Sequence, residues 1–286
     1  MIVRMKKLIL VLLVIFLSFS LSAQNPDEQK YLLTTNTYAF GLSTLRFIDP
    51  YLSPLTYNGN GFNFNHESRR FLSLNTTNIS LQNKYYLVAG IAYNPAKTSS
   101  MLYFGANYSW GMHYHFRPFK GLQLLAGSSW DVDFGFKNVV RNINNPVNLD
   151  IATNFNLSGL ARYDIYLHRK TLRLQLAIET PILGWMFVPS AGASYYEMFQ
   201  LGNSSNISHF SSIFNKRGIN PKLTIDVPFN RSIWEFGISY QELKYTANQL
   251  VFERNEFKLL VGTTFDVISF AGRKKQAPHN FISSNQ

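Results

Sequence analysis

Residues 102–116 read LYFGANYSWGMHYHF, and this stretch decides the fold. Every second residue, counted from Leu102, is apolar or aromatic, whereas the residues between them are mostly small or polar. Because successive side chains of a β-strand point to opposite faces, the pattern predicts a strand with one apolar and one polar face. Its length is far greater than the ~5–6 residues usual for strands of globular sheets.

The same alternation recurs along the chain, in residues 122–136, 149–167, 172–178, 223–229, 234–241 and 257–267. A soluble β-sandwich also alternates, but its outer face carries Lys, Glu and Thr, whereas here the polar face holds Gly, Ser, Asn and isolated charges. Aromatic residues near the ends of the apolar face are typical of the girdles of a membrane barrel. We therefore predict an all-β, antiparallel transmembrane β-barrel, with a secreted sandwich or jelly roll as the alternative.

The composition agrees with this prediction. Only 15% of the 286 residues are charged, 15% are aromatic, and the mean hydropathy is −0.08. Alternating apolar and polar residues cancel in such an average, as expected for a barrel in lipid. The sequence contains no cysteine, which excludes a lipoprotein anchor and thiolate metal sites.

The N-terminal residues form the pattern of a secretory signal peptide. Three basic residues precede the apolar run 8–17, and small residues follow up to Ala23. We expect residues 1–23 to be a cleaved signal peptide, with an uncleaved anchor as the alternative. We then expect an N-terminal periplasmic segment at 24–36, the barrel at 37–270 and a polar C-terminal tail at 271–286.

The formal charge of the whole chain is +11, and without the signal peptide it is +8, from 24 basic and 16 acidic residues. The basic residues are scattered along the sequence, and an exported chain does not meet nucleic acid. We therefore predict no nucleic-acid partner. The expected partners are outer-membrane lipid, lipopolysaccharide and the barrel assembly machinery, together with an envelope protein.

The number of strands is harder to predict than their existence. We expect about twelve, with ten to fourteen compatible with the pattern, near residues 37–47, 70–81, 85–94, 101–116, 121–136, 148–167, 171–180, 193–201, 206–214, 218–229, 232–245 and 256–270. Because short turns of bacterial barrels face the periplasm, we place 82–84, 117–120 and 168–170 there. The expected outer loops are 95–100, 137–147 and 181–192, and 49–69 is expected to be mainly one long outer loop or a hairpin above the membrane.

One outer segment carries a resemblance to a known family. The signal ending SLSAQ and the stretch YLSPLTYNGNGFNF resemble an uncharacterised family of Bacteroidetes envelope proteins, which is known only as a domain of unknown function. The resemblance implies a barrel-like architecture without an assigned reaction. Its matching residues are Tyr51, Leu52, Ser53, Pro54, Leu55, Tyr57 and Gly59. This segment is interpreted either as an ordered turn that packs on its own barrel or as a loop that docks a partner.

His113 and His115 are the candidate metal ligands. Positions i and i+2 of a strand face the same side, so both imidazoles are predicted to face the lumen. A metal site needs a third ligand, which the sequence does not place, and the alternative is that both histidines belong to a polar network. We predict no cofactor. No histidine lies in a nucleophile signature, so the sequence favours a non-enzymatic protein and leaves catalytic residues unassigned.

Charged residues of both signs are predicted to face the lumen. They would either pair across strands and fill a narrow barrel or form a constriction that selects solutes by charge. These predicted lumen charges are Asp131, Asp133, Asp150, Arg162, Asp164, Arg173, Glu179, Asp226, Glu235, Lys258 and Asp266.

The functional hypothesis is an integral outer-membrane β-barrel of a Gram-negative bacterium. It would serve as a small, porin-like channel or as a structural or docking protein of the envelope. Two alternatives stay open: a barrel hydrolase that acts on lipid or a surface substrate, and a component of an export or gliding assembly.

Overall fold

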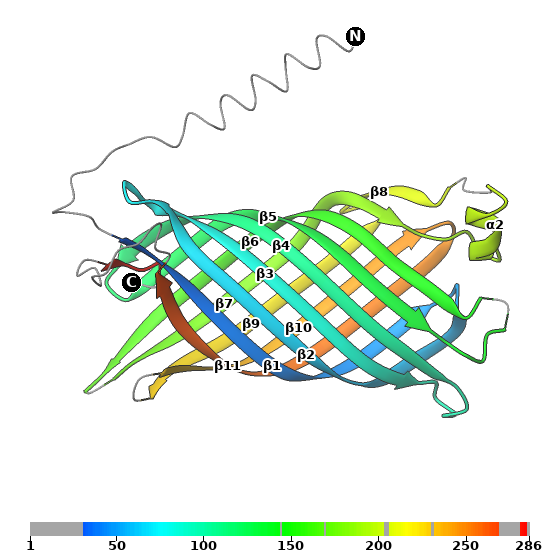
Figure 1. Ribbon diagram of the computed structural model, residues 1–286, viewed down its shortest axis with the longest axis horizontal. Helices are drawn as coiled ribbons and strands as arrows, with labels where there is room; N and C mark the ends of the chain where they lie inside the picture. The colour runs from blue at the N-terminus through cyan, green and yellow to red at the C-terminus, as the bar shows by residue number, and fades with distance from the viewer. Residues whose placement is uncertain are drawn as a thin grey trace, which may run out of the picture.

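The computed structural model describes residues 31–143, 145–168, 170–202, 206–229, 232–268 and 281–284, so the predicted signal peptide lies outside the described residues. Ten long strands each pair antiparallel with their neighbours, and the last of them, β11, pairs with β1 to close a barrel (Figure 1). The all-β antiparallel barrel is therefore confirmed. Its strands are β1 (Tyr31–Asp49), β2 (Ser53–Ser73), β3 (Thr76–Tyr93), β4 (Ser100–Phe119), β5 (Leu122–Asn138), β6 (Val147–Leu167), β7 (Lys170–Phe187), β9 (Lys216–Phe229), β10 (Ser232–Ala247) and β11 (Leu250–Ile268).

The connections differ in length between the two ends of the barrel. At the end where β1 begins and β11 ends, on the left in Figure 1, all four connections are two residues long. At the other end they are 50–52, 94–99, 139–146, 188–215 and 248–249. Since outer-membrane barrels have short periplasmic turns and longer outer loops, we call the first end the periplasmic end and the second the outer end.

The longest outer connection contains two small elements. The helix α2 (Tyr195–Phe199) begins at a capping box between Ser194 and Glu197. The strand β8 (Ser208–Ser212) pairs with the outer half of β7, while the periplasmic half of β7 pairs with β9. No helix in the described part of the chain is both long and apolar enough to cross a membrane.

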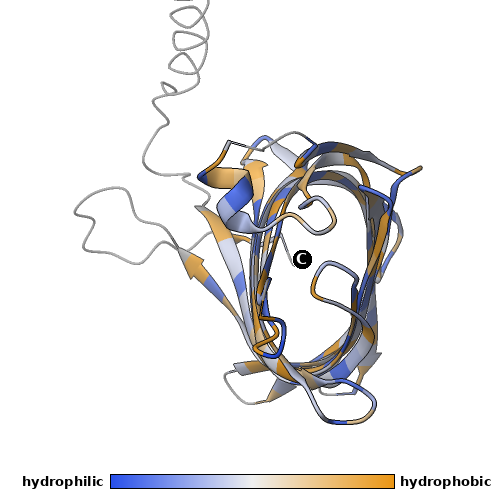
Figure 2. Ribbon diagram, turned by 90° about the vertical axis from the view of Figure 1, so that its right-hand side faces the viewer, coloured by the Kyte–Doolittle hydropathy of each residue, from blue (hydrophilic) through white to orange (hydrophobic). Residues whose placement is uncertain are grey.

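Large apolar side chains cover the outside of the barrel. Trp110 pairs with Trp130 across β4 and β5, and both rings are exposed, as is Trp234 on β10. Figure 2 shows apolar and polar residues alternating along the ribbons of the oval barrel. Exposed apolar patches on soluble monomers are rarely larger than a few hundred Å². A continuous apolar surface of this kind is therefore unfavourable in water, whereas it is suited to contact with the acyl chains of lipids.

The barrel has ten strands, fewer than the twelve expected but within the expected range of ten to fourteen. The loop predicted at 49–69 is wrong, because its residues belong mainly to β2. The turn predicted at 82–84 lies inside β3, and the strand predicted at 70–81 contains the real turn between β2 and β3. The segment predicted as a strand at 193–201 contains α2 instead, and 206–214 reduces to β8, outside the barrel ring.

Local sequence signals explain the missed strand. Asn-Gly pairs at 58–59 and 60–61 are turn signals, yet both lie in β2. A side chain at Gly59 would place its Cβ only 1.9 Å from the backbone oxygen of Ile91 on β3. Glycine is therefore needed there for the close approach of two strands and does not mark a turn.

Candidate functional site

The predicted lumen charges all belong to barrel strands, and most of them line two cavities. Asp131, Asp133, Glu179, Glu235 and Lys258 line a central cavity of about 160 Å³. Arg162, Asp226 and again Glu235 line a smaller cavity of about 30 Å³ towards the periplasmic end. A ten-stranded barrel is only slightly wider than the eight-stranded barrels whose interiors side chains just fill, so small cavities rather than an open channel are expected.

The remaining predicted lumen charges form local contacts along the wall. Arg173 on β7 binds Asp164 on β6 through two hydrogen bonds of 2.7 and 3.0 Å. The carboxylate of Asp266 accepts a 2.5 Å hydrogen bond from the hydroxyl of Thr35. Asp150 belongs to a buried group at the outer end, described below. The structure thus brings the predicted charges into several separate groups along the lumen.

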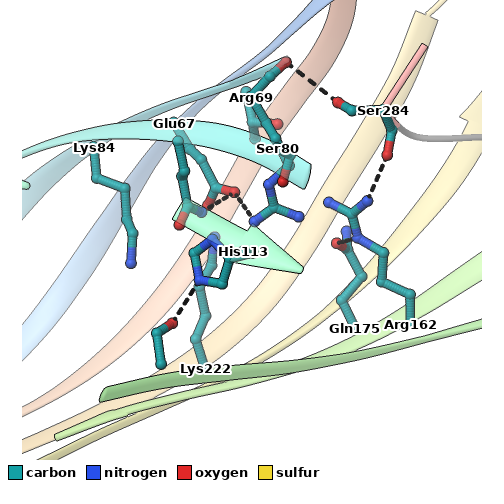
Figure 3. A network of polar contacts seen from close by, with 12 residues as sticks. Glu67, Arg69, Ser80, Lys84, His113, Arg162, Gln175, Lys222 and Ser284 are labelled. Carbon is teal, nitrogen blue, oxygen red and sulfur yellow. Dashed lines mark hydrogen bonds and ion pairs between the residues drawn. The ribbon is translucent and has the colours of Figure 1, made fainter. Parts of the chain in front are cut away.

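Several charged residues of the lumen wall were missed from the sequence, among them Glu67, Arg69, Lys84 and Lys222. Arg69 binds Glu67 at 2.8 Å (Figure 3). Lys84 binds Glu179 at 2.5 Å, and Lys222 binds Glu235 at 3.0 Å. Glu67 and Arg69 were missed because their segment was interpreted as a loop. Lys222 alternates with Leu223 and Ile225 in the same way as Asp226, so the pattern of that strand contained the signal.

The periplasmic end of the lumen holds four residues of the expected C-terminal tail. The short strand β12 (Phe281–Ile282) pairs in parallel with the first residues of β1. The guanidinium of Arg162 donates a 3.1 Å hydrogen bond to the carbonyl of Ser284, whose hydroxyl bonds the carbonyl of Arg69 at 3.3 Å (Figure 3). Ser284 is completely buried, so this segment fills part of the lumen.

His113 and His115 both face the lumen, on the periplasmic half of β4. The Nε2 atom of His113 lies 2.9 Å from the hydroxyl of Ser158, and that of His115 lies 2.7 Å from the hydroxyl of Ser80. Within the described residues, no group of three or more His, Cys, Asp or Glu side chains is placed to hold a metal ion. Each imidazole therefore takes part in the polar lining of the wall.

Apolar side chains fill the outer end of the lumen. Tyr51, Leu52 and Tyr57 of the family-like segment are buried there, whereas Leu55 is exposed. Ser53 and Pro54 begin β2, and Gly59 lies within it. The buried side chains in contact are Leu45, Phe47, Tyr51, Leu52, Tyr57, Val88, Ala92, Met101, Tyr103, Val139, Met186, Val188, Tyr245, Ala247 and Phe252. We call these residues, together with the ion pairs beneath them, the outer cap.

A buried ion triad supports the outer cap. The ammonium of Lys137 lies 2.6 Å from Asp49 and 2.9 Å from Asp150. Asp49 is completely buried, and the side-chain amide of Asn148 donates a further 2.8 Å hydrogen bond to it. Burial of these charges requires their mutual pairing, because an unpaired charge in a dry environment is very unfavourable.

Outer loops close over this triad. The hydroxyl of Tyr51 donates a 2.8 Å hydrogen bond to the carbonyl of Ala193, just before α2. The amide of Asn142 donates a 2.9 Å hydrogen bond to the carbonyl of Leu52. The first, third and fourth outer connections are thereby tied together across the mouth.

Alkaline pH is expected to loosen this closure through Tyr51. Its burial, and secondarily the carboxylates of Asp49 and Glu197, raise the pKa of Tyr51 from 10 to about 12. Below pH 10 the phenol of Tyr51 is neutral in both the folded and the unfolded chain. Between pH 10 and about 12 only the unfolded chain loses this proton, and the free energy of unfolding therefore falls in this range. Denaturant unfolding across this range should show a steeper loss for the wild type than for Tyr51→Phe. An equal pH dependence of the free energy of unfolding in the two proteins would contradict this role of Tyr51.

A family model described as "Protein of unknown function (DUF3316)" matches residues 8–274, which confirms the resemblance to a family of unknown function, while the Bacteroidetes origin stays a prediction. No curated protein matches the chain.

Several solved outer-membrane structures are similar over most of the chain. The outer membrane protease OmpT from Escherichia coli is 8% identical, with a TM-score of 0.48, over 87% of this chain and 99% of that one. The transport unit of the autotransporter AIDA-I from E. coli is 9% identical, with a TM-score of 0.43, over 88% and 94%. The translocator domain of the autotransporter NalP from Neisseria meningitidis is 9% identical, with a TM-score of 0.39, over 82% and 89%.

Proposed function

Since the chain belongs to the family described as "Protein of unknown function (DUF3316)", whose description assigns no activity, we propose its function from the geometry. We propose that it is a closed barrel of the outer membrane, which serves the envelope as a structural or docking protein and not as an open pore. Export by the expected cleavable signal peptide and insertion by the barrel assembly machinery belong to the same proposal. The apolar exterior, which suits lipid and lipopolysaccharide chains, supports the location.

The closure of the lumen carries this proposal. At the outer end, the outer cap buries Asp49 and Lys137 beneath the apolar side chains of Tyr51 and Leu52. At the periplasmic end, Ser284 lies between Arg69 and Arg162. A solute that crosses the barrel would have to displace both groups and break a buried ion triad, which is strongly unfavourable.

The docking role is supported by the outer surface. The connection 188–215 presents exposed rings on α2, on β8 and just after β8, which are Tyr196, Phe199, Phe210 and Phe214. Aromatic residues are enriched at protein interfaces because they bury a large area at little conformational cost. An envelope protein that meets this surface is the partner we expect, including a component of an export or gliding assembly.

Planar-bilayer recording tests the closure directly. The refolded full chain should show no steady single-channel steps, because both ends of the lumen are filled. Heat-modifiable gel mobility of the same preparation verifies that the barrel is folded, and an open porin inserted into the same lipid is the positive control. Regular steps from the wild-type chain would overturn the proposal in favour of a channel.

A gated small channel is the second candidate, and the central cavity of about 160 Å³ favours it. Such a channel would conduct only after the outer cap opens. Steady single-channel steps from a chain whose outer cap is broken would therefore favour the gated channel over a permanently filled barrel. No contact among the described residues specifically favours the hydrolase.

A further inference from the structure

We propose that the central cavity binds a small zwitterion, such as a free amino acid, between Asp131 on β5 and Lys216 on β9. This inference does not depend on the docking role. It rests on two charges of opposite sign, the buried Lys216 and the half-buried Asp131, which face the same cavity without an ion-pair partner among the described residues.

Lys216 is the first of these charges. Only 3% of its surface is exposed, and it lines the central cavity. Its ammonium donates a 2.6 Å hydrogen bond to the side-chain oxygen of Asn154, and it forms no ion pair with any described residue. An ammonium has three donors, so this contact leaves donor capacity directed to other oxygen atoms.

Asp131 is the second charge. Its two carboxylate oxygens accept hydrogen bonds of 2.6 Å from Asn154 and 2.7 Å from Asn156. It too forms no ion pair with a residue in the described part of the chain. Asn154 therefore stands between the two charges, accepting from Lys216 and donating to Asp131.

The other lysines and the arginine that line this cavity are paired with carboxylates. Lys84 binds Glu179, Lys222 binds Glu235 and Arg254 binds Asp133. Asp131 and Lys216 are linked only through Asn154, and a ligand that carries both signs would contact both charges directly. An anion or a cation alone would compensate only one of them. The expected ligand therefore presents a carboxylate to Lys216 and an ammonium to Asp131.

A third polar group and the size of the cavity agree with a small ligand. Ser109 lines the same cavity, and its hydroxyl is buried without a hydrogen-bond partner among the described residues. The cavity of about 160 Å³ far exceeds the ~10–15 Å³ that one water molecule needs. It accommodates a solute of several heavy atoms and excludes a folded peptide. Because both ends of the lumen are filled, entry requires local opening, and binding must be measured after long equilibration.

Equilibrium dialysis of the refolded full chain with radiolabelled glycine tests this site. We expect saturable binding of one glycine per barrel. Acetate and methylammonium each carry one of the two charges and should compete about tenfold or more weakly, as the loss of one charge-assisted hydrogen bond implies. Absence of saturable glycine binding, or equally strong competition by either ion, would overturn the proposal.

Two substitutions and two matched controls locate the site. Asp131→Asn and Lys216→Met should each weaken glycine binding about tenfold or more. Glu253→Gln and Lys244→Met alter a 2.5 Å pair between β10 and β11 in which Lys244 is largely exposed, and they should bind like the wild type. If both site variants bound glycine as tightly as the wild type, the proposal would be contradicted. If a site variant does not show the heat-modifiable gel mobility of a folded barrel, its binding is not compared. The competition of acetate and methylammonium with glycine on the wild-type chain then tests the proposal by itself.

Discussion

Methionine in place of Lys137 is expected to destabilise the folded barrel by about 3–5 kcal/mol, the usual effect of removing one partner of a buried ion pair. Lys137 is the cation that compensates both Asp49 and Asp150 beneath the outer cap. Methionine retains a similar volume, so the main change is electrostatic: the buried Asp49 and the half-buried Asp150 are left without their shared counter-charge. The outer connections held by this group should then open.

Denaturant unfolding in lipid vesicles measures the stability, and bilayer recording reports whether the mouth has opened. The triple variant Lys137→Met, Asp49→Asn, Asp150→Asn should recover part of the loss, because no charge is left unpaired. Lys244→Met is the matched control, since an exposed pair contributes about 0–1 kcal/mol. An unchanged stability in Lys137→Met would show that the buried triad does not hold the outer cap. A destabilised chain that stays silent in the bilayer would show that opening the outer cap alone does not open the lumen, as expected while Ser284 fills the periplasmic end.

Arginine in place of Leu42 should destabilise the barrel by about 2–4 kcal/mol if this position faces the middle of a bilayer. Leu42 on β1 is 57% exposed, and its cross-strand neighbours Phe62 and Leu259 are exposed as well. In water, arginine at such an exposed position would be nearly neutral. The predicted loss can therefore come only from transferring a charge into hydrocarbon.

Unfolding from phospholipid vesicles gives the required free-energy difference. Phe214→Arg is the control, because Phe214 is 87% exposed in the outer connection between β8 and β9, away from the expected hydrocarbon region. It should change stability by only a few tenths of a kcal/mol. If Leu42→Arg proved as harmless as the control, the apolar exterior would not be embedded in lipid.

The orientation of side chains was largely predictable from the sequence. Period-two alternation assigned Trp110 and Trp130 to the outer surface, and the structure places both rings there. The same alternation assigned Asp131 and Asp133 to the lumen, where they line the central cavity. This succeeds because the face of a strand residue depends only on its parity within the strand, which is a local property.

The limits of the strands were less predictable, because turn signals are also local and can mislead. Asn58, Gly59 and Asn60 are typical of a turn, but Gly59 is required by the backbone of β3, which is distant in sequence. The segment around α2 contains apolar residues at a spacing compatible with a strand, and a capping box that begins at Ser194 turns it into a helix instead.

By itself, the sequence determined the class of fold, the lipid-facing and lumen-facing sides of most strands, and part of the set of charges that had to be accommodated inside. The tertiary structure alone decided which charges meet. Lys137 reaches Asp49 across 88 positions of sequence, and Arg162 reaches Ser284 across 122. Such partners depend on the strand number and on the stagger between strands, which are set only when the last strand pairs with the first.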